Sequence, residues 1–125
     1  MTTDLKHQKP PAYSEQDLAE FEKLIKNKLI IEEYRRTNAI SDLADFNDSH
    51  TDEDDEFNGE RSGIQDRIAV ATQNIKECES ALNRIDANTY GVCKATGKLI
   101  DKRRLLLRPM VMLSLSASLS ADNKS

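Results

Sequence analysis

The chain has 125 residues, with 22 acidic and 18 basic side chains and a formal charge of -4. Hydrophobic residues make up 38% of it and there is no tryptophan, which excludes a thick core. No run of about 18 apolar residues occurs, which argues against a membrane-spanning helix, and two cysteines make no disulfide framework. The polar start lacks the apolar region of a secretory signal, so we expect a protein of the reducing cytoplasm.

Residues 1–13 are expected to form a flexible tail, and a long helix should follow it. The segment Ser14 to Asp17 has the form of a capping box, with a hydroxyl group followed three residues later by an acid. Apolar residues then recur at steps of three and four, at Leu18, Phe21, Leu24, Ile25 and Leu29. This spacing predicts an amphipathic helix that ends near Arg36 or near Phe46.

Residues 47–63 interrupt the apolar pattern and should form the turn between two helices. They are rich in Asn, Asp, Ser and Gly, which are poor helix formers. The wider segment 41–60 carries nine acidic groups and no basic group. An acidic tip is one interpretation, and a disordered loop that only keeps the protein in solution is the other.

The second predicted helix has the clearest periodicity. Its apolar residues follow alternating steps of four and three, which is a heptad seam: Ile64, Ile68, Ala71, Ile75, Cys78, Leu82 and Ile85. The seam must be buried, either against the first helix folded back antiparallel or in an intermolecular coiled coil. Cys78 belongs to this seam, so it is expected to be a small buried hydrophobic residue rather than a reactive thiol.

A small subdomain should follow the second helix. Gly91 suits the left-handed turn that ends the helix, and residues 90–100 have the pattern of a short β-hairpin. Asp101 can cap a short basic helix over residues 102–107, which Pro109 limits. Residues 110–120 alternate between apolar residues and serine, which favours a strand, although a helix is also possible.

Residues 90–109 (YGVCKATGKLIDKRRLLLRP) resemble the finger of the DksA/TraR family, which comprises bacterial transcription regulators with a C4-type zinc finger. The resemblance implies a mainly α fold, in which an antiparallel helical hairpin with an acidic tip precedes a small zinc-finger-like α+β subdomain. The expected parts are a tail over 1–13, a coiled-coil hairpin over 14–89 with its tip at about 47–63, and a finger with a C-terminal segment over 90–125.

The finger departs from the family pattern at three of its four zinc-ligand positions. Cys93 matches the first, while Thr96, Ser114 and Ala117 stand at the other three. A structural zinc site needs four cysteine or histidine ligands, and alanine cannot coordinate a metal. We therefore predict no zinc, a Cys93 thiol that packs against Leu99 and Leu113, and a subdomain held together by apolar packing.

The family places its acidic hairpin tip near the active site of RNA polymerase. Asp52 and Asp55 match the spacing of the family's two tip aspartates, with Glu53 between them. Counting back from Cys93 without gaps instead aligns the motif with His50, Glu53 and Asp55. A third candidate is the acidic ladder, a set of aspartates spaced three residues apart: Asp42, Asp45 and Asp48. Such carboxylates could bias a Mg²⁺-dependent site electrostatically.

Four basic residues, namely Lys102, Arg103, Arg104 and Arg108, occupy the block that the resemblance assigns to polymerase docking. A solvated basic helix face is the alternative interpretation. Val70, Glu77 and Ser118 stand at the family's basic positions for the alarmone ppGpp, so we predict a poor response to ppGpp.

The resemblance implies a regulator that binds the RNA polymerase core as a monomer, enters its secondary channel and modulates transcription initiation without sequence-specific DNA binding. The alternative is a coiled-coil adaptor or dimerising structural protein. No glycine-rich phosphate loop or nucleophile–base pair occurs, so an enzyme is not expected. The basic block is too short and the chain too acidic for direct DNA binding, and no membrane association is expected.

Overall fold

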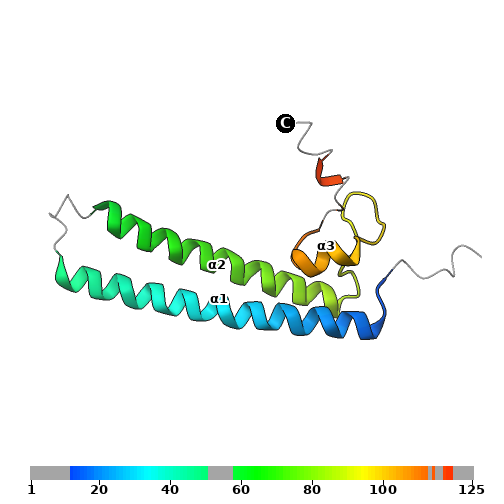
Figure 1. Ribbon diagram of the computed structural model, residues 1–125, viewed down its shortest axis with the longest axis horizontal. Coiled ribbons are helices and arrows are strands. Elements are labelled where there is room, and N and C mark those ends of the chain that lie inside the picture. The colour runs from blue at the N-terminus through cyan, green and yellow to red at the C-terminus, as the bar shows by residue number, and fades with distance from the viewer. Residues whose placement is uncertain (1–11, 51–57, 113, 115–116, 120–125) are drawn as a thin grey trace, which may run out of the picture. The chain divides into compact units, whose positions relative to one another are not determined.

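A computed structural model describes residues 12–50, 58–112, 114 and 117–119. Three helices follow one another in the chain: α1 (Glu15–Ser49), α2 (Asn58–Asp86) and α3 (Lys102–Leu107) (Figure 1). The predicted mainly α architecture with a long helical hairpin is confirmed. None of the described helices combines the length and the apolar character that a membrane crossing requires.

The chain divides into two compact units, which are described separately. One unit comprises residues 25–80, and the other comprises residues 1–24 together with 81–125. The predicted boundaries at residues 13 and 89 do not coincide with this division, and they stay a prediction.

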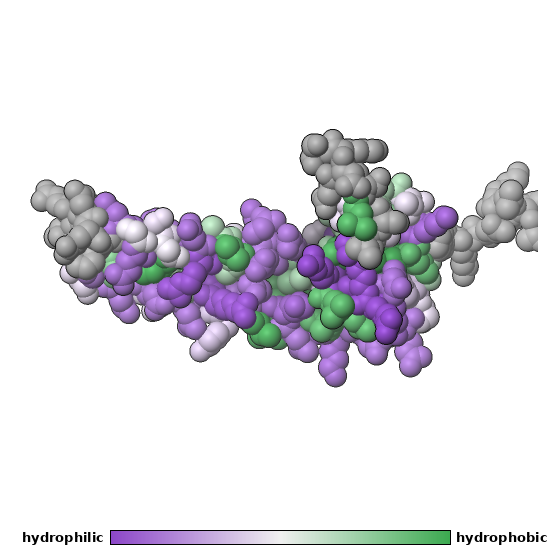
Figure 2. Space-filling view, turned by 45° about the horizontal axis from the view of Figure 1, so that its top comes forward, coloured by the Kyte–Doolittle hydropathy of each residue, from purple (hydrophilic) through white to green (hydrophobic). Residues whose placement is uncertain are grey.

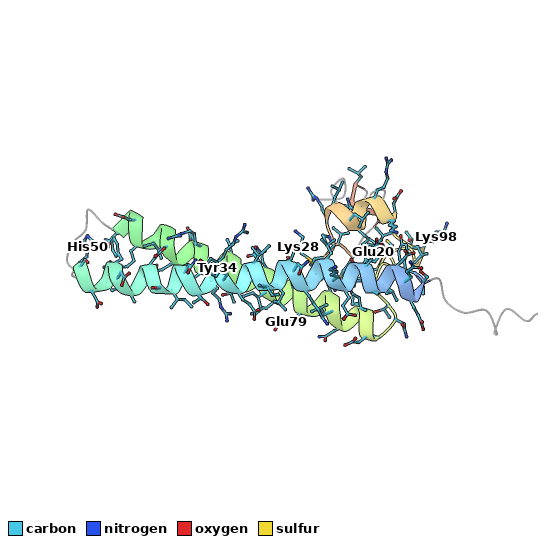
Figure 3. All side chains as sticks on the ribbon, turned by 60° about the horizontal axis from the view of Figure 1, so that its bottom comes forward. Glu20, Lys28, Tyr34, His50, Glu79 and Lys98 are labelled. Atoms are coloured by element: carbon cyan, nitrogen blue, oxygen red, sulfur yellow. The ribbon has the colours of Figure 1, made fainter. Side chains whose placement is uncertain are left out.

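The unit of residues 25–80 is an antiparallel pair formed by the long stretches of α1 and α2, which run side by side (Figures 1 and 3). Its core is a single seam between the two helices, made of Ile25, Ala39, Phe46, Ile64, Ala71, Ile75 and Cys78. The heptad residues of α2 therefore lie against α1 of the same chain, as predicted for an intramolecular hairpin. Most other side chains on the helices face outwards, and the face in Figure 2 is largely hydrophilic.

Helix α1 extends past Arg36 and ends close to Phe46, the longer of the two predicted alternatives. The buried positions continue at steps of seven from Ile25, but the next one is Glu32, which is only 9% exposed, and it is followed by Ala39 and Phe46. A charged and a small residue in the seam conceal the heptad when apolar residues alone are counted. The helix ends at Ser49, whose hydroxyl donates to the carbonyl oxygen of Asp45 at 3.0 Å.

Helix α2 begins at Asn58, within the segment expected to be a turn. Gly59 and Gly63 lower helix propensity by about 1 kcal/mol each relative to alanine. They do not stop the helix, because burial of the seam from Ile64 onwards stabilises the helix and offsets this cost. The turn predicted over residues 47–63 is therefore too long, because residues 47–49 belong to α1 and residues 58–63 to α2.

The second unit is organised around Tyr90, which is 1% exposed. Its ring lies 5.2 Å from that of Phe21, and its hydroxyl donates to the carbonyl oxygen of Pro109 at 2.7 Å. Ile100 and Leu105 complete the core and are fully buried. Phe21, near the start of α1, thus shares one small core with Tyr90, Ile100 and Leu105 from the segment that follows α2.

Helix α1 starts as the capping pattern predicted. The hydroxyl of Ser14 accepts a hydrogen bond from the backbone amide of Asp17 at 3.1 Å. The preceding Tyr13 packs edge-on against Phe21, with 5.4 Å between ring centroids, and donates its phenolic hydrogen bond to Ile100. This pair of contacts ties Tyr13 to the core of its unit, so its assignment to the predicted flexible tail is wrong.

The predicted β-hairpin over residues 90–100 is reduced to one antiparallel bridge between Val92 and Leu99, and the described residues contain no strand. Gly91 and Gly97 have φ values of 80° and 74°, which turn the chain on either side of Cys93. The paired segments are too short for a ladder, because α3 begins at Lys102. The β part of the expected α+β subdomain is thus wrong.

Glycine is required at position 91. A Cβ atom there would lie 2.8 Å from the ring of Tyr13, and the positive φ is unfavourable for any other residue. Asn88, in the same turn after α2, also has a positive φ of 60°. Asparagine tolerates this conformation better than most residues.

The short basic helix is confirmed. Asp101 caps α3 by accepting from the backbone amide of Arg103 at 2.8 Å, and the helix ends one residue before Arg108, ahead of Pro109. In the C-terminal segment, residues 117–119 are helical, and the amide of Ser118 donates to the carbonyl of Ser114. Of the two alternatives for this segment, residues 117–119 follow the helix, whereas residues 110–112 and 114 lie in neither a helix nor a strand.

Candidate functional site

The acidic segment lies between α1 and α2. Asp52, Glu53 and Asp55 fall outside the described residues, so the choice between the two tip registers stays open. His50, from the other register, is half-buried at the loop end of α1 (Figure 3), and its Nδ1 lies 2.9 Å from the carbonyl oxygen of Phe46. The side chain is therefore engaged with its own helix.

The acidic ladder of Asp42, Asp45 and Asp48 lies along the exposed side of α1. Asp42 pairs with Arg67 of α2 at 3.3 Å, and both side chains are more than half exposed. Asp42 and Asp45 line a hollow of about 700 Å³ together with Glu60. Within the described residues, no three acidic, histidine or cysteine side chains converge closely enough to hold a metal ion. The ladder is thus a charged surface rather than a chelating site.

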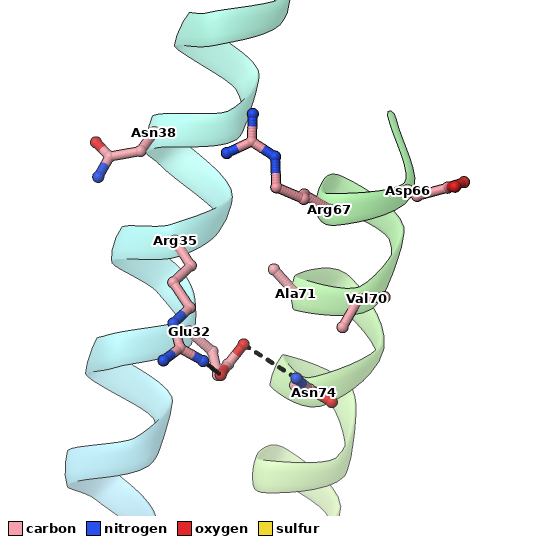
Figure 4. A pocket seen from close by; sticks show the side chains of 8 residues that line it. All are labelled: Glu32, Arg35, Asn38, Asp66, Arg67, Val70, Ala71 and Asn74. Carbon is pink, nitrogen blue, oxygen red and sulfur yellow. Dashed lines mark hydrogen bonds and ion pairs between the residues drawn. The ribbon is translucent and has the colours of Figure 1, made fainter. Parts of the chain in front are cut away.

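A second groove of about 490 Å³ lies between the helices of the same unit (Figure 4). At its floor the carboxylate of Glu32 accepts a hydrogen bond from Asn74 at 3.1 Å and pairs with Arg35 at 2.8 Å. Sequence reasoning missed this polar pair in the seam. Continuing the seven-residue steps of Leu18 and Ile25 by one more repeat would have placed Glu32 there.

The basic residues of the second unit divide into two groups. The ammonium group of Lys102 lies 3.1 Å from Asp17 and 3.3 Å from Glu20, and the hydrogen bond to Asp17 is the main cause of its raised pKa. A separation of 85 positions hides this contact from sequence reasoning. Lys102 therefore ties α3 to the start of α1, and a docking role would require it to leave these partners.

The three arginines have a different setting. Arg103 and Arg108 are exposed, Arg104 is half-buried, and all three line a hollow of about 540 Å³ together with Leu99 and Leu107. Leu107 is 81% exposed. The surface around α3 therefore offers guanidinium groups beside apolar side chains, a combination that suits a protein partner.

The four positions of the expected finger site come together. Cys93 is 1% exposed, its Sγ accepts from the amide of Ser114 at 3.3 Å, and Sγ lies 3.6 Å from the Ser114 hydroxyl. That hydroxyl in turn accepts from the amide of Ala117 at 3.3 Å. A hydrogen-bond network thus joins the positions that metal–ligand bonds would join in a zinc finger.

The network changes the chemistry of the thiol. A hydrogen bond from the side chain of Thr96, followed by the Ser114 amide, lowers the pKa of Cys93 to about 6. One thiolate with two hydroxyl groups and a methyl group does not match the donor set of structural zinc. A zinc-free finger stays a prediction. Apolar packing was expected to hold the subdomain together, and the structure adds these polar contacts to it. Leu113, one of the two residues predicted to pack against Cys93, lies outside the described residues.

The other cysteine behaves as predicted from the seam. Cys78 is fully buried, and burial raises the pKa of its thiol. It is therefore protonated at neutral pH and acts as a small apolar residue of the core.

The predicted alarmone positions lie on both units. Val70 is 59% exposed and Glu77 is exposed on α2, so neither supplies a positive charge. Ser118 is half-buried in the helical turn of residues 117–119. The predicted weak response to ppGpp stays a prediction.

The fold matches a solved structure, that of the transcription factor DksA2 from Pseudomonas aeruginosa. The two share 25% sequence identity with a TM-score of 0.82, over 89% of this chain and 87% of the other. No protein-family model and no curated protein sequence matches the chain. The chain therefore has a DksA-like fold, and the structural match supports the resemblance to the DksA/TraR family.

Proposed function

We propose that this protein is a non-catalytic transcription regulator that binds RNA polymerase in the cytoplasm. The observation that carries the proposal is the match to DksA2, a transcription factor, which extends over 89% of the chain. Such coverage includes both the helical hairpin and the segment after it, so the likeness goes beyond a generic pair of helices.

The acidic loop is the part that we propose to act on the polymerase. The loop joins two long helices whose seam is buried within one chain, so α1 and α2 can present it as a narrow probe. We propose that the loop enters the secondary channel and that Asp52 and Asp55 bias the Mg²⁺-dependent active site, with Glu53 beside them. Mg²⁺ prefers oxygen ligands, so carboxylate groups close to the active site would change the electrostatic field around its metal ion.

Docking is proposed to use the arginines around α3. Arg103, Arg104 and Arg108 can each donate two parallel hydrogen bonds to a carboxylate. The intramolecular seam also weighs against the dimerising adaptor, because most of the heptad residues that such an adaptor would use for pairing are already buried against α1. The regulator is proposed to act as a monomer and without sequence-specific contacts to DNA.

The experiment compares the wild-type chain with an Asp52→Asn, Asp55→Asn double variant. Both are tested for co-purification with core RNA polymerase and for their effect on transcription from a purified promoter. We expect both proteins to bind, and only the wild type to change the level of transcription. Failure of the wild type to bind core polymerase would overturn the proposal, and full regulation by the double variant would remove the role of these aspartates.

A further inference from the structure

The base of the acidic loop is built around Arg61, in the first turn of α2. Its Nε donates to the side-chain oxygen of Asn47 on α1 at 3.1 Å, and its Nη1 donates to that of Asn58 at 3.2 Å. Asn47 lies two residues before the end of α1 at Ser49, and Asn58 is the first residue of α2. One guanidinium group therefore links the end of one helix to the beginning of the other.

Aromatic rings support the same guanidinium group. The Cζ atom of Arg61 lies 5.2 Å from the centroid of the Phe46 ring, within the range of a cation–π contact. The His50 ring also stacks on Phe46, with 4.1 Å between centroids and an angle of 18° between the planes. Phe46 is itself buried in the seam, so this stack is anchored in the core of the hairpin.

The partners of Arg61 are neutral, although acidic residues surround it in the sequence. Among the described residues it forms no ion pair, and its Nη2 is buried without a hydrogen-bond partner. Two amide oxygens and an aromatic ring hold the group instead. Such contacts are directional and respond to salt less than ion pairs do.

We propose that Arg61 is a positioning residue for the acidic loop. Residues 51–57 begin directly after His50 and end directly before Asn58, so the chain enters and leaves the loop through this cluster. By joining Asn47 to Asn58 over the Phe46 ring, Arg61 holds the two helix ends at a constant separation. The effect on transcription that we assign to it rests on the proposed function, whereas its effect on the helix ends does not.

The first test measures the helix ends alone, by hydrogen exchange of the full chain. Arg61→Ala should raise the exchange rates of the backbone amides of residues 47–50 at least about tenfold, as expected when a local contact is lost. Arg67→Ala is the matched control, because Arg67 is also on α2 and its partner is the exposed Asp42. Unchanged exchange in Arg61→Ala, or an equal rise in Arg67→Ala, would overturn the proposal.

The second test measures regulation apart from binding. Arg61→Ala should bind core polymerase within about twofold of the wild type but need at least about tenfold more protein for the same effect on transcription. Asn47→Ala removes one exposed partner only and should give a smaller shift in the same direction, which keeps the test valid if Arg61→Ala folds poorly. Wild-type regulation by both variants would overturn the positioning role.

The two tests separate this inference from the proposed function. If the wild type does not bind polymerase, the proposed function and the transcriptional part of the inference fall together. The exchange result would still show whether Arg61 orders the helix ends.

Discussion

The hydroxyl group of Tyr90 gives the sharpest test of the small core. It donates to the carbonyl oxygen of Pro109 at 2.7 Å, and both residues are buried. Tyr90→Phe keeps the ring and its contact with Phe21 but leaves a buried carbonyl without its donor. Loss of such a bond costs about 1–2 kcal/mol in the free energy of unfolding.

The assay is urea unfolding followed by circular dichroism, with Tyr34→Phe as the matched control. Tyr34 is 69% exposed, so its variant should stay within about 0.5 kcal/mol of the wild type. In a chain of this size the loss in Tyr90→Phe corresponds to a fall in Tm of about 3–10 °C. Equal stability of Tyr90→Phe and the wild type would refute the role of this hydrogen bond.

The same residue predicts a dependence on pH. Burial raises the pKa of Tyr90 to about 12, above its ordinary value of 10.0. The folded state therefore favours the protonated phenol, and its contribution to stability is complete below pH 10 and is lost as the pH rises towards 12. The wild type should lose stability in this range more steeply than Tyr90→Phe, and parallel curves would contradict the assignment.

Three further predictions concern other parts of the chain. Asn74→Ala should destabilise the hairpin by about 1–3 kcal/mol in urea unfolding, because it removes a donor to the buried Glu32 carboxylate, whereas the exposed Asn38→Ala should be neutral. The pKa of Cys93 is lowered from 9.0 to about 6, so its thiolate stabilises the fold fully above pH 9.0, and this contribution is lost as the pH falls towards about 6. Cys93→Ala should therefore flatten the dependence of Tm on pH over this range, and an unchanged dependence would contradict the prediction. Metal analysis of the purified protein should find no stoichiometric zinc, and a chelator should leave the circular dichroism unchanged.

The helices were predictable because their signals are local. The α2 seam, the Ser14 cap and the Asp101 cap each depend on residues within a few turns, and both caps appear as expected. Five of the seven heptad residues are buried, whereas Ile68 and Leu82 are half-buried and Ala81 is buried in place of Leu82. Of the two predicted ends of α1, the one near Arg36 was too early, since Glu32 occupies a seam position that apolar counting passes over, and the one near Phe46 lies close to the observed end at Ser49. Burial with a hydrogen-bond partner, rather than hydrophobicity, keeps that position in the core.

The candidate site was predictable only in part, because its contacts join distant residues. No local pattern indicates that Lys102 pairs with Asp17, or that Arg61 bridges Asn47 and Asn58. The zinc-ligand positions could be located from the resemblance. The hydrogen bonds between Ser114 and Cys93 depend on the folded path of the chain, which the sequence pattern does not specify.

The most direct measurement of the proposed function asks where the acidic loop lies on the polymerase. A photo-crosslinking amino acid at position 57, beside the aspartates, is incorporated into the full chain, and the product is mixed with core RNA polymerase. Crosslinks to the segments that line the secondary channel near the catalytic Mg²⁺ are the predicted result. Absence of binding, or crosslinks confined to the outer surface of the enzyme, would contradict the central claim.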